Sequence, residues 1–167
     1  ADFPILGGNL SRVDGTMAAL PYTIVQRGGL KIGIIGMTNP NAPRWDGEKV
    51  DSFTFAPVGP ATQKIVEIIK DKVDVIIVVA HVGLYPEYDE DFGSDSGMKI
   101  LEMNPDIDVL LLGHAHITLQ EKMGDTVVGS ARNLGREVVR FDLTIGMDKK
   151  VTSSSVEVID MADYQPS

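Results

Sequence analysis

The chain has 167 residues and a formal net charge of −9, from 15 basic and 24 acidic residues. That length suffices for one domain with a hydrophobic core but leaves little room for two. The acidic balance argues against binding to nucleic acid polymers or anionic membranes, because both require a Lys/Arg-rich surface. The absence of cysteine excludes disulfides and thiolate ligands, and no stretch approaches the roughly 18 apolar residues of a membrane span.

The first third of the chain predicts mainly β-structure. Residues 3–10 predict a short strand that loosens at a glycine pair. Residues 22–26 and 30–36 flank a glycine turn and predict a β-hairpin, whose second arm is apolar enough for a central strand. Residues 37–55 contain two prolines and the single tryptophan, and they predict a long irregular loop of the kind that is usually functional or mobile.

The middle of the chain predicts two helix–strand steps. Isoleucines at helical spacing predict a helix over residues 60–72, and an apolar strand over 74–80 follows directly. Residues 96–103 predict a shorter helix that stops near Pro105, before an apolar strand over 107–112. Apart from Asp74 and Asp108, both strands are apolar, and they are bounded by glycine and polar residues, which is typical of buried parallel strands.

The last part of the chain changes in character. Residues 126–130, 137–145 and 151–159 alternate in the manner of half-buried antiparallel strands. The order therefore predicts an α/β fold in which a mixed sheet is followed by antiparallel strands, within one domain over residues 1–159. Residues 160–167 are polar and contain a proline, so they predict the start of a linker.

All three histidines stand directly after the two apolar strands. His81 follows the strand at 74–80, and His114 and His116 follow the strand at 107–112. Ligand sites in open α/β sheets lie beyond the carboxyl ends of the strands, and neutral imidazole is a common ligand of Zn, Mn, Fe and Ni. A single histidine at a strand end is more often a hydrogen-bonded polar residue than a ligand. The grouping of all three at strand ends favours a metal site.

Other chemistries have weaker support. The acidic loop over residues 84–96 can add carboxylate ligands, although acidic residues in loops are more often solvated. There is no Gly-x-Ser-x-Gly or phosphate-binding loop, and Gly33-Ile34-Ile35-Gly36 does not match Gly-x-Gly-x-x-Gly. Three imidazoles do not complete a hydrolytic site, which also needs a bridging carboxylate and an acid for the leaving group.

Two segments carry a resemblance to known proteins: Val79-Ala80-His81-Val82-Gly83, and Asn104-Pro105-Asp106-Ile107-Asp108 continuing to Gly113-His114-Ala115-His116. They resemble the calcineurin-like metallophosphoesterases, and within them the bacterial 5′-nucleotidase and 2′,3′-cyclic-nucleotide phosphodiesterase branch. That branch has a His-x-Gly block, then a strand that ends in Gly-His-x-His. Residues 3–10, 30–38 and 133–136 resemble further segments, so the likeness covers nearly all of the chain.

The resemblance implies a four-layer α/β/β/α sandwich, of which this chain supplies one sheet and its helices. It also implies two divalent metal ions, such as Zn, Mn or Fe, with His81 and His114 on one ion and His116 on the other. His116 is further expected near the transferring phosphoryl group, and Asn9 is expected to be structural. The implied substrate is a nucleotide or another phosphoester, attacked by metal-generated hydroxide.

The chain departs from that family at its beginning. The family's Asp-x-His, Gly-Asp and Gly-Asn-His-Glu/Asp motifs, which supply the bridging aspartate, further ligands and a catalytic histidine, do not occur here. We therefore expect the C-terminal part of a catalytic domain, inactive alone, with its catalytic residues upstream and unidentified. Such a part would expose one sheet face, which predicts self-association or a co-purifying N-terminal piece.

Two alternatives remain open from the sequence. One is a non-catalytic module on the same scaffold that uses its acidic loops to bind a partner or a metal. The other is a related hydrolase of a different ester, including sulfur esters. By the same resemblance, the protein is expected outside the cell, in the cell wall or in the periplasm.

Overall fold

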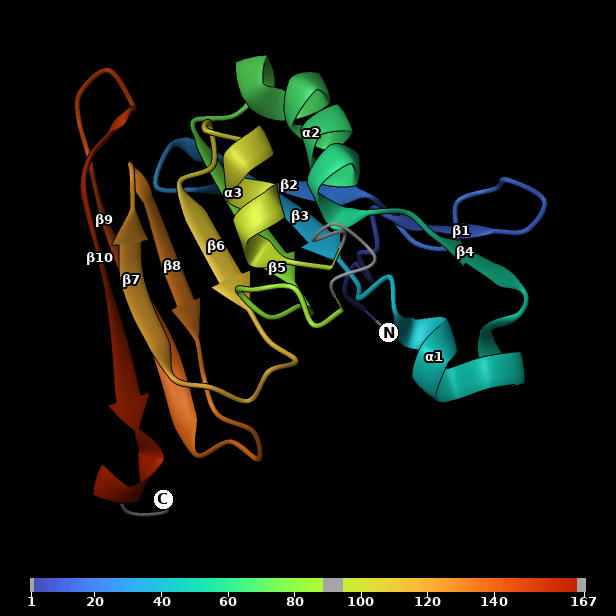
Figure 1. The fold of residues 1–167 in the computed structure, drawn as a ribbon. Coiled ribbons are helices and arrows are strands. Elements are labelled where there is room, and N and C mark those ends of the chain that lie inside the picture. Colours follow the sequence, from blue (N-terminus) through green and yellow to red (C-terminus); the bar gives the residue numbers. More distant parts are fainter. Residues whose placement is uncertain (1, 89–94, 165–167) are drawn as a thin grey trace.

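The computed structural model describes residues 2–88 and 95–164, and a mixed sheet of six strands forms its centre (Figure 1). These strands are β2 (Tyr22–Arg27), β3 (Leu30–Met37), β5 (Val75–Ala80), β6 (Val109–Leu112), β7 (Leu119–Met123) and β8 (Thr126–Ser130). Their order across the sheet is β2-β3-β5-β6-β8-β7. The four inner strands are parallel, and the edge strands β2 and β7 are antiparallel to their neighbours.

Further elements flank this sheet. They are the strands β1 (Leu10–Arg12), β4 (Phe53–Phe55), β9 (Glu137–Ile145) and β10 (Val151–Asp160), and the helices α1 (Ala42–Asp46), α2 (Val58–Ile69) and α3 (Gly97–Met103). Short 3-10 helices cover Gly47–Val50, Lys70–Lys72 and Met161–Asp163. Among the described residues, no helix has the length and apolar character needed to cross a membrane.

Helices α2 and α3 cover one face of the sheet (Figure 1). Apolar residues recur along α2 at helical spacing, so Ile65 and Ile69 point into the core. They belong to the same buried cluster as Ile35, Val78 and Leu110 of the three central strands, each of which is fully buried. Burying one side chain of this size stabilises the fold by about 1.5–3 kcal/mol relative to exposure. This layer therefore holds the parallel strands in place.

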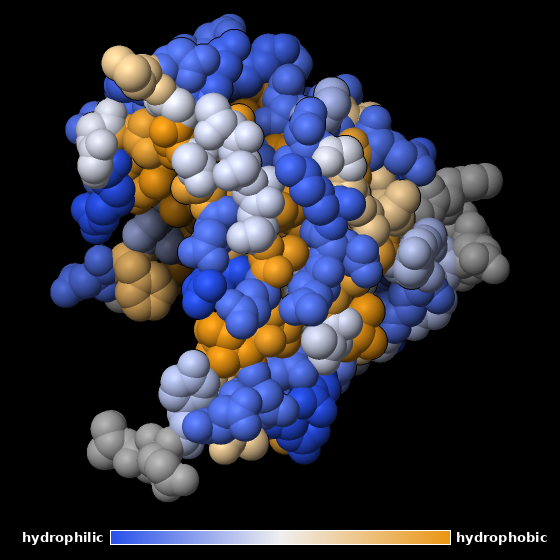
Figure 2. All heavy atoms as spheres, turned by 90° about the vertical axis from the view of Figure 1, so that its left-hand side faces the viewer, coloured by the Kyte–Doolittle hydropathy of each residue, from blue (hydrophilic) through white to orange (hydrophobic). Residues whose placement is uncertain are grey.

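Strands β9 and β10 form an antiparallel ribbon that packs over β7 and β8 on the opposite face (Figure 1). Gly129 of β8 permits the close approach, because a Cβ atom there would lie 2.5 Å from Val139 Cγ1 and 2.8 Å from Phe141 Cζ. A view onto this side shows apolar side chains reaching the surface between polar ones (Figure 2). The lack of a side chain at Gly129 thus sets how closely the ribbon can pack.

The rest of this second face is only partly covered. Val79 lies on the central strand β5 and is nevertheless 40% exposed. Its neighbours on the same face, Ile34, Ile77 and Leu111, are only half-buried. A central strand normally buries both faces in a parallel sheet. This apolar surface, defined by these four residues, is called the open face below.

The predicted fold class, an α/β fold with a mixed sheet followed by antiparallel strands, is confirmed. The helix predicted at 60–72 begins at Val58 and ends at Ile69, followed by a 3-10 turn. The strand predicted at 3–10 is wrong, because the regular strand β1 begins only at Leu10 and Leu6 instead packs against Gly36 of β3. β7 was not predicted.

Two further predictions are wrong in detail. The irregular loop expected at 37–55 contains α1, a 3-10 helix and β4. Residues 126–130 were expected to be half-buried and antiparallel. They form β8, which does pair antiparallel with β7 but is fully buried and also pairs parallel with β6. Of the acidic loop, residues 89–94 lie outside the described residues. The domain limit at residue 159 and the linker at 160–167 remain predictions, although β10 ends at Asp160.

We predict that Gly129→Ala destabilises the protein by about 1–3 kcal/mol, because the added methyl group overlaps the ribbon. Urea unfolding followed by circular dichroism measures the change. Val139→Ala in the same background removes the closest contact and should recover part of the loss. An alanine variant as stable as the wild type would contradict this account of the ribbon packing.

Candidate metal centre

The carboxyl ends of two neighbouring strands bring His81 and His114 together. β5 and β6 pair in parallel with Ala80 opposite Leu112, so the residues that follow each strand lie side by side. The two imidazole rings have centroids 5.3 Å apart and are close to perpendicular, at 73°. A Cβ at Gly113 would lie 3.2 Å from His81 Nδ1, so glycine leaves room for the ring.

The backbone at His114 and His116 adopts an uncommon conformation. Their φ angles are 65° and 54°, in the left-handed region. This region costs a non-glycine residue about 1–2 kcal/mol, and such residues cluster at functional sites. Between them the Ala115 amide donates to the Gly113 carbonyl at 2.7 Å, which closes a tight turn. The chain therefore stores strain at the two histidines that the sequence singled out.

Besides His81, two other segments of the chain contact His114. Glu87, in the loop after β5, has Oε2 2.9 Å from His114 Nε2. Trp45 of α1 lies with its ring centroid 5.0 Å from that of His114, tilted by 35°. The ring centroid of Tyr88 lies 6.4 Å from that of Trp45. Trp45 and Glu87 were not predicted as site residues from the sequence; the only signals were that Trp45 is the single tryptophan and that Glu87 lies in the acidic loop.

The pKa of His81 is lowered from its ordinary value. Partial burial of the ring is the main cause, and the possible positive charges of His114 and His116 add to it. A lowered pKa favours the neutral imidazole, which is the form that coordinates metal ions. The structure thus places His81 and His114 in ring contact, and His116 follows His114 after one residue.

The donor set fits divalent transition metals in kind but is incomplete. Imidazole nitrogens are ligands that Zn, Mn and Fe accept. Within residues 2–88 and 95–164, however, no three His, Cys, Asp or Glu side chains converge on a point that could hold an ion. The described residues therefore offer two adjacent nitrogen donors and a third nearby, and a full binuclear site requires further ligands.

A pocket of about 690 Å³ lies at the opposite end of the parallel strands and does not involve the histidines. Its lining includes Lys70, Asp106 and Lys150, near the amino ends of β5 and β6 and the start of β10. Because ligand sites of open α/β sheets lie beyond the carboxyl ends of the strands, we place the candidate site at the histidines.

Asn9 has the structural role that the resemblance implied. Its side chain is buried, its Nδ2 donates to the carbonyls of Thr38 (2.8 Å) and Ala56 (3.0 Å), and its Oδ1 accepts from the Thr38 amide at 2.9 Å. These bonds join the chain leaving β3 to the segment after β4. Asn9 therefore fixes the region from which α1 and Trp45 extend.

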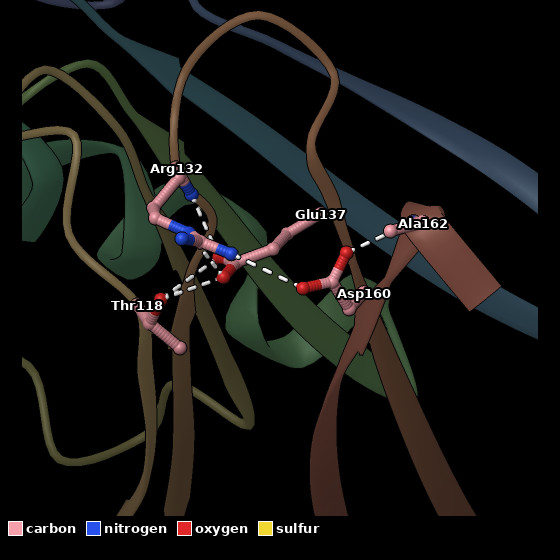
Figure 3. A network of polar contacts seen from close by, with 5 residues as sticks. All are labelled: Thr118, Arg132, Glu137, Asp160 and Ala162. Atoms are coloured by element: carbon pink, nitrogen blue, oxygen red, sulfur yellow. Dashed lines mark hydrogen bonds and ion pairs between the residues drawn. The ribbon is translucent and has the colours of Figure 1, made fainter.

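A second polar network fixes the segment that follows the histidines (Figure 3). The Thr118 hydroxyl donates to the Glu137 carboxylate, 2.8 and 2.9 Å from its two oxygens. The Arg132 amide donates to Glu137 Oε2 at 2.9 Å, and the Arg132 guanidinium binds both Glu137 and Asp160. Ala162 donates its amide to Asp160 at 2.9 Å. The turn from His116 into β7 is thus anchored to both strands of the ribbon.

With this geometry in place, comparison with known proteins identifies the family. The sequence matches the calcineurin-like phosphoesterase family over residues 4–118. Since the match covers more than half of the chain, the protein belongs to the calcineurin-like phosphoesterase family.

Individual relatives agree with this assignment. An uncharacterized metallophosphoesterase, YunD, of Bacillus subtilis is 25% identical over 98% of this chain and 34% of its own length. A 2′,3′-cyclic-nucleotide 2′-phosphodiesterase/3′-nucleotidase of Salmonella typhimurium is 27% identical over 73% of this chain and 21% of its own length. The crystal structure of a putative 5′-nucleotidase from Staphylococcus aureus superimposes with a TM-score of 0.82 at 27% identity, covering 95% of this chain and 33% of that one. The chain thus spans about a third of YunD and of the S. aureus protein.

We predict that Glu137→Gln destabilises the fold and that wild-type stability falls in acid. Bonds from the Arg132 amide, the Thr118 hydroxyl and the Arg132 guanidinium lower the pKa of Glu137. A carboxyl whose pKa is depressed on folding stabilises the protein above its unfolded pKa, and this contribution is lost as the pH falls through the lowered value. Urea unfolding at a series of pH values measures both effects. If the stability of the glutamine variant fell with decreasing pH as steeply as that of the wild type, the prediction would be contradicted.

Proposed function

We propose that this chain forms part of a two-metal phosphoesterase that acts on nucleotides, as a 5′-nucleotidase or a 2′,3′-cyclic-nucleotide phosphodiesterase. In this proposal His81 and His114 bind one ion and His116 binds the second. The observation that carries it is the ring contact of His81 and His114 at the carboxyl ends of β5 and β6, in a chain of this family. The two relatives with nucleotidase names support the substrate class.

The roles of this chain's own residues follow from their positions. When bound, two divalent ions would supply an activated hydroxide and neutralise charge on the phosphoryl oxygens. His81 is biased toward the neutral form that can donate a nitrogen lone pair. His114 and His116 are separated by one residue and both have a left-handed backbone, and in this proposal each supplies a ligand to a different ion. Gly113 lets the His81 ring lie against the β6 end.

The remaining ligands and the catalytic acid are proposed to come from a part of the protein outside this chain. The chain spans about a third of the length of YunD and lacks the family's upstream motifs. We further propose that this missing part covers the open face, and that the chain in isolation self-associates through it. The half-buried Ile34, Ile77 and Leu111 and the exposed Val79 support this proposal. Placement outside the cytoplasm remains a prediction from the resemblance.

We predict that His114→Ala removes most Zn²⁺ or Mn²⁺ binding by this chain, because it deletes one of two adjacent nitrogen donors. Isothermal titration and elemental analysis after dialysis measure the loss. Gln26→Ala is the matched control, since Gln26 is exposed on the edge strand β2, beside the amino end of β3 and away from the histidines. Metal binding that is equal in both variants would contradict the assignment of His114, and would favour a module that binds metal elsewhere.

We also predict that Val79→Lys reduces self-association of the isolated chain, because it places a charge in the centre of the open face. Light scattering over a range of concentrations measures the effect. Val138→Lys is the control: Val138 is 49% exposed, against 40% for Val79, but lies on the ribbon. A wild-type chain that is a monodisperse monomer, with no second piece by mass spectrometry, would rule out this account of the open face.

A further inference from the structure

We propose that Glu87 and Trp45 are positioning residues for His114. Together they fix the orientation of its imidazole and hold the proton on Nε2, so that Nδ1 is presented to the metal ion. The part of this inference that concerns the metal rests on the proposed function. The part that concerns the ring itself rests only on the contacts of Glu87, Trp45 and His81 with His114.

The hydrogen bond that Glu87 accepts from His114 determines which nitrogen of the imidazole carries the proton. Glu87 Oε2 lies 2.9 Å from His114 Nε2, across 27 residues of sequence. An ionised carboxylate can only accept a hydrogen bond, so Nε2 must be the donor. In a neutral imidazole the other nitrogen, Nδ1, then keeps its lone pair. Histidines that bind metals usually donate their second N–H to such a partner, which fixes the tautomer and orients the ring.

The indole of Trp45 restricts rotation of the same ring. The centroids of Trp45 and His114 are 5.0 Å apart, with 35° between their planes. Helix α1 buries none of its residues, and Trp45 itself is 45% exposed. The helix therefore contributes little to the hydrophobic core. The Trp45 ring contacts the rings of His114 and Tyr88, and these contacts place the Trp45 side chain at the candidate site.

A buried aspartate connects the two positioning residues. Asp95 is 1% exposed and accepts from Asn41 Nδ2 at 2.6 Å, at the start of α1, and from the backbone amide of Glu87 at 3.3 Å. Arg44, next to Trp45, donates from Nε to Asn41 Oδ1 at 3.1 Å. One buried carboxylate thus ties α1 and the Glu87 segment to the same point. This arrangement holds Glu87 and Trp45 on His114 together.

A further ring contact continues this arrangement. The Arg44 guanidinium lies over the Tyr88 ring, 4.3 Å from its centroid, and Tyr88 in turn lies beside Trp45. A cation over an aromatic face is attracted by the ring quadrupole. Arg44, Tyr88 and Trp45 therefore contact one another beside His114 and restrict one another's movement.

The test is long-range ¹H–¹⁵N correlation of the histidine rings in this chain, above a pH of about 8, where an ordinary histidine is neutral. Without metal, His114 should be in the Nε2–H form, and Glu87→Ala should shift it toward a mixture of tautomers. On addition of Zn²⁺, the ¹⁵N shift of His114 should move at Nδ1. Zn²⁺ affinity should fall by about 10-fold in Glu87→Ala, in the range known for partners that orient a ligand.

Matched variants separate positioning from folding. Trp45→Ala should weaken Zn²⁺ binding and Trp45→Phe should restore part of it, because phenylalanine keeps an aromatic face. Glu48→Ala is the control, since Glu48 is an exposed acid in the 3-10 helix after α1. An Nδ1–H tautomer in the wild type, a Zn²⁺ shift at Nε2, or an unchanged tautomer and affinity in Glu87→Ala would overturn the inference. Failure of the wild type to bind Zn²⁺, with the Nε2–H form and its dependence on Glu87 intact, would instead overturn the metal assignment.

Discussion

The parallel register of β5 and β6 is the constraint on which the candidate site depends. Because Ala80 pairs with Leu112, His81 emerges beside Gly113, and the His114 ring follows at 5.3 Å. A slip of one residue in either strand would reverse the faces of all its side chains. It would place apolar side chains such as Val78 and Leu110 away from α2 and α3 and would separate the histidines. The buried core therefore fixes the site geometry as well as the fold.

Two buried carboxylates extend this control from the strands to the loops. Asp95 holds α1 and the Glu87 segment on one side of His114. Glu137 holds Thr118 and Arg132, next to the turn that leads from His116 into β7. A loop with few contacts opens readily, whereas both loops at this site donate hydrogen bonds to a buried carboxylate, Asp95 or Glu137. This rigidity is consistent with the strained backbone at His114 and His116, which must be held by its surroundings.

The sequence allowed the central part of this arrangement to be predicted. The apolar runs that became β5 and β6 end in histidines, and the general geometry of α/β sheets places such ends together. Residues 126–130 were expected to be only half-buried because they mix polar residues and glycine with valine, whereas Val128 joins the core cluster and Gly129 packs against the ribbon. Trp45 and Glu87 were not assigned because their contacts with His114 depend on how two loops fold. Nothing in local periodicity specifies a contact between residues 45 and 114.

Crystallography of the longer protein that we propose, loaded with Zn²⁺ and measured at the zinc absorption edge, would test the central claim most directly. We expect an anomalous peak with nitrogen ligands at about 2.1 Å from His81 and from His114 Nδ1, and a second peak at His116. A bound ion away from the carboxyl ends of β5 and β6 would contradict it.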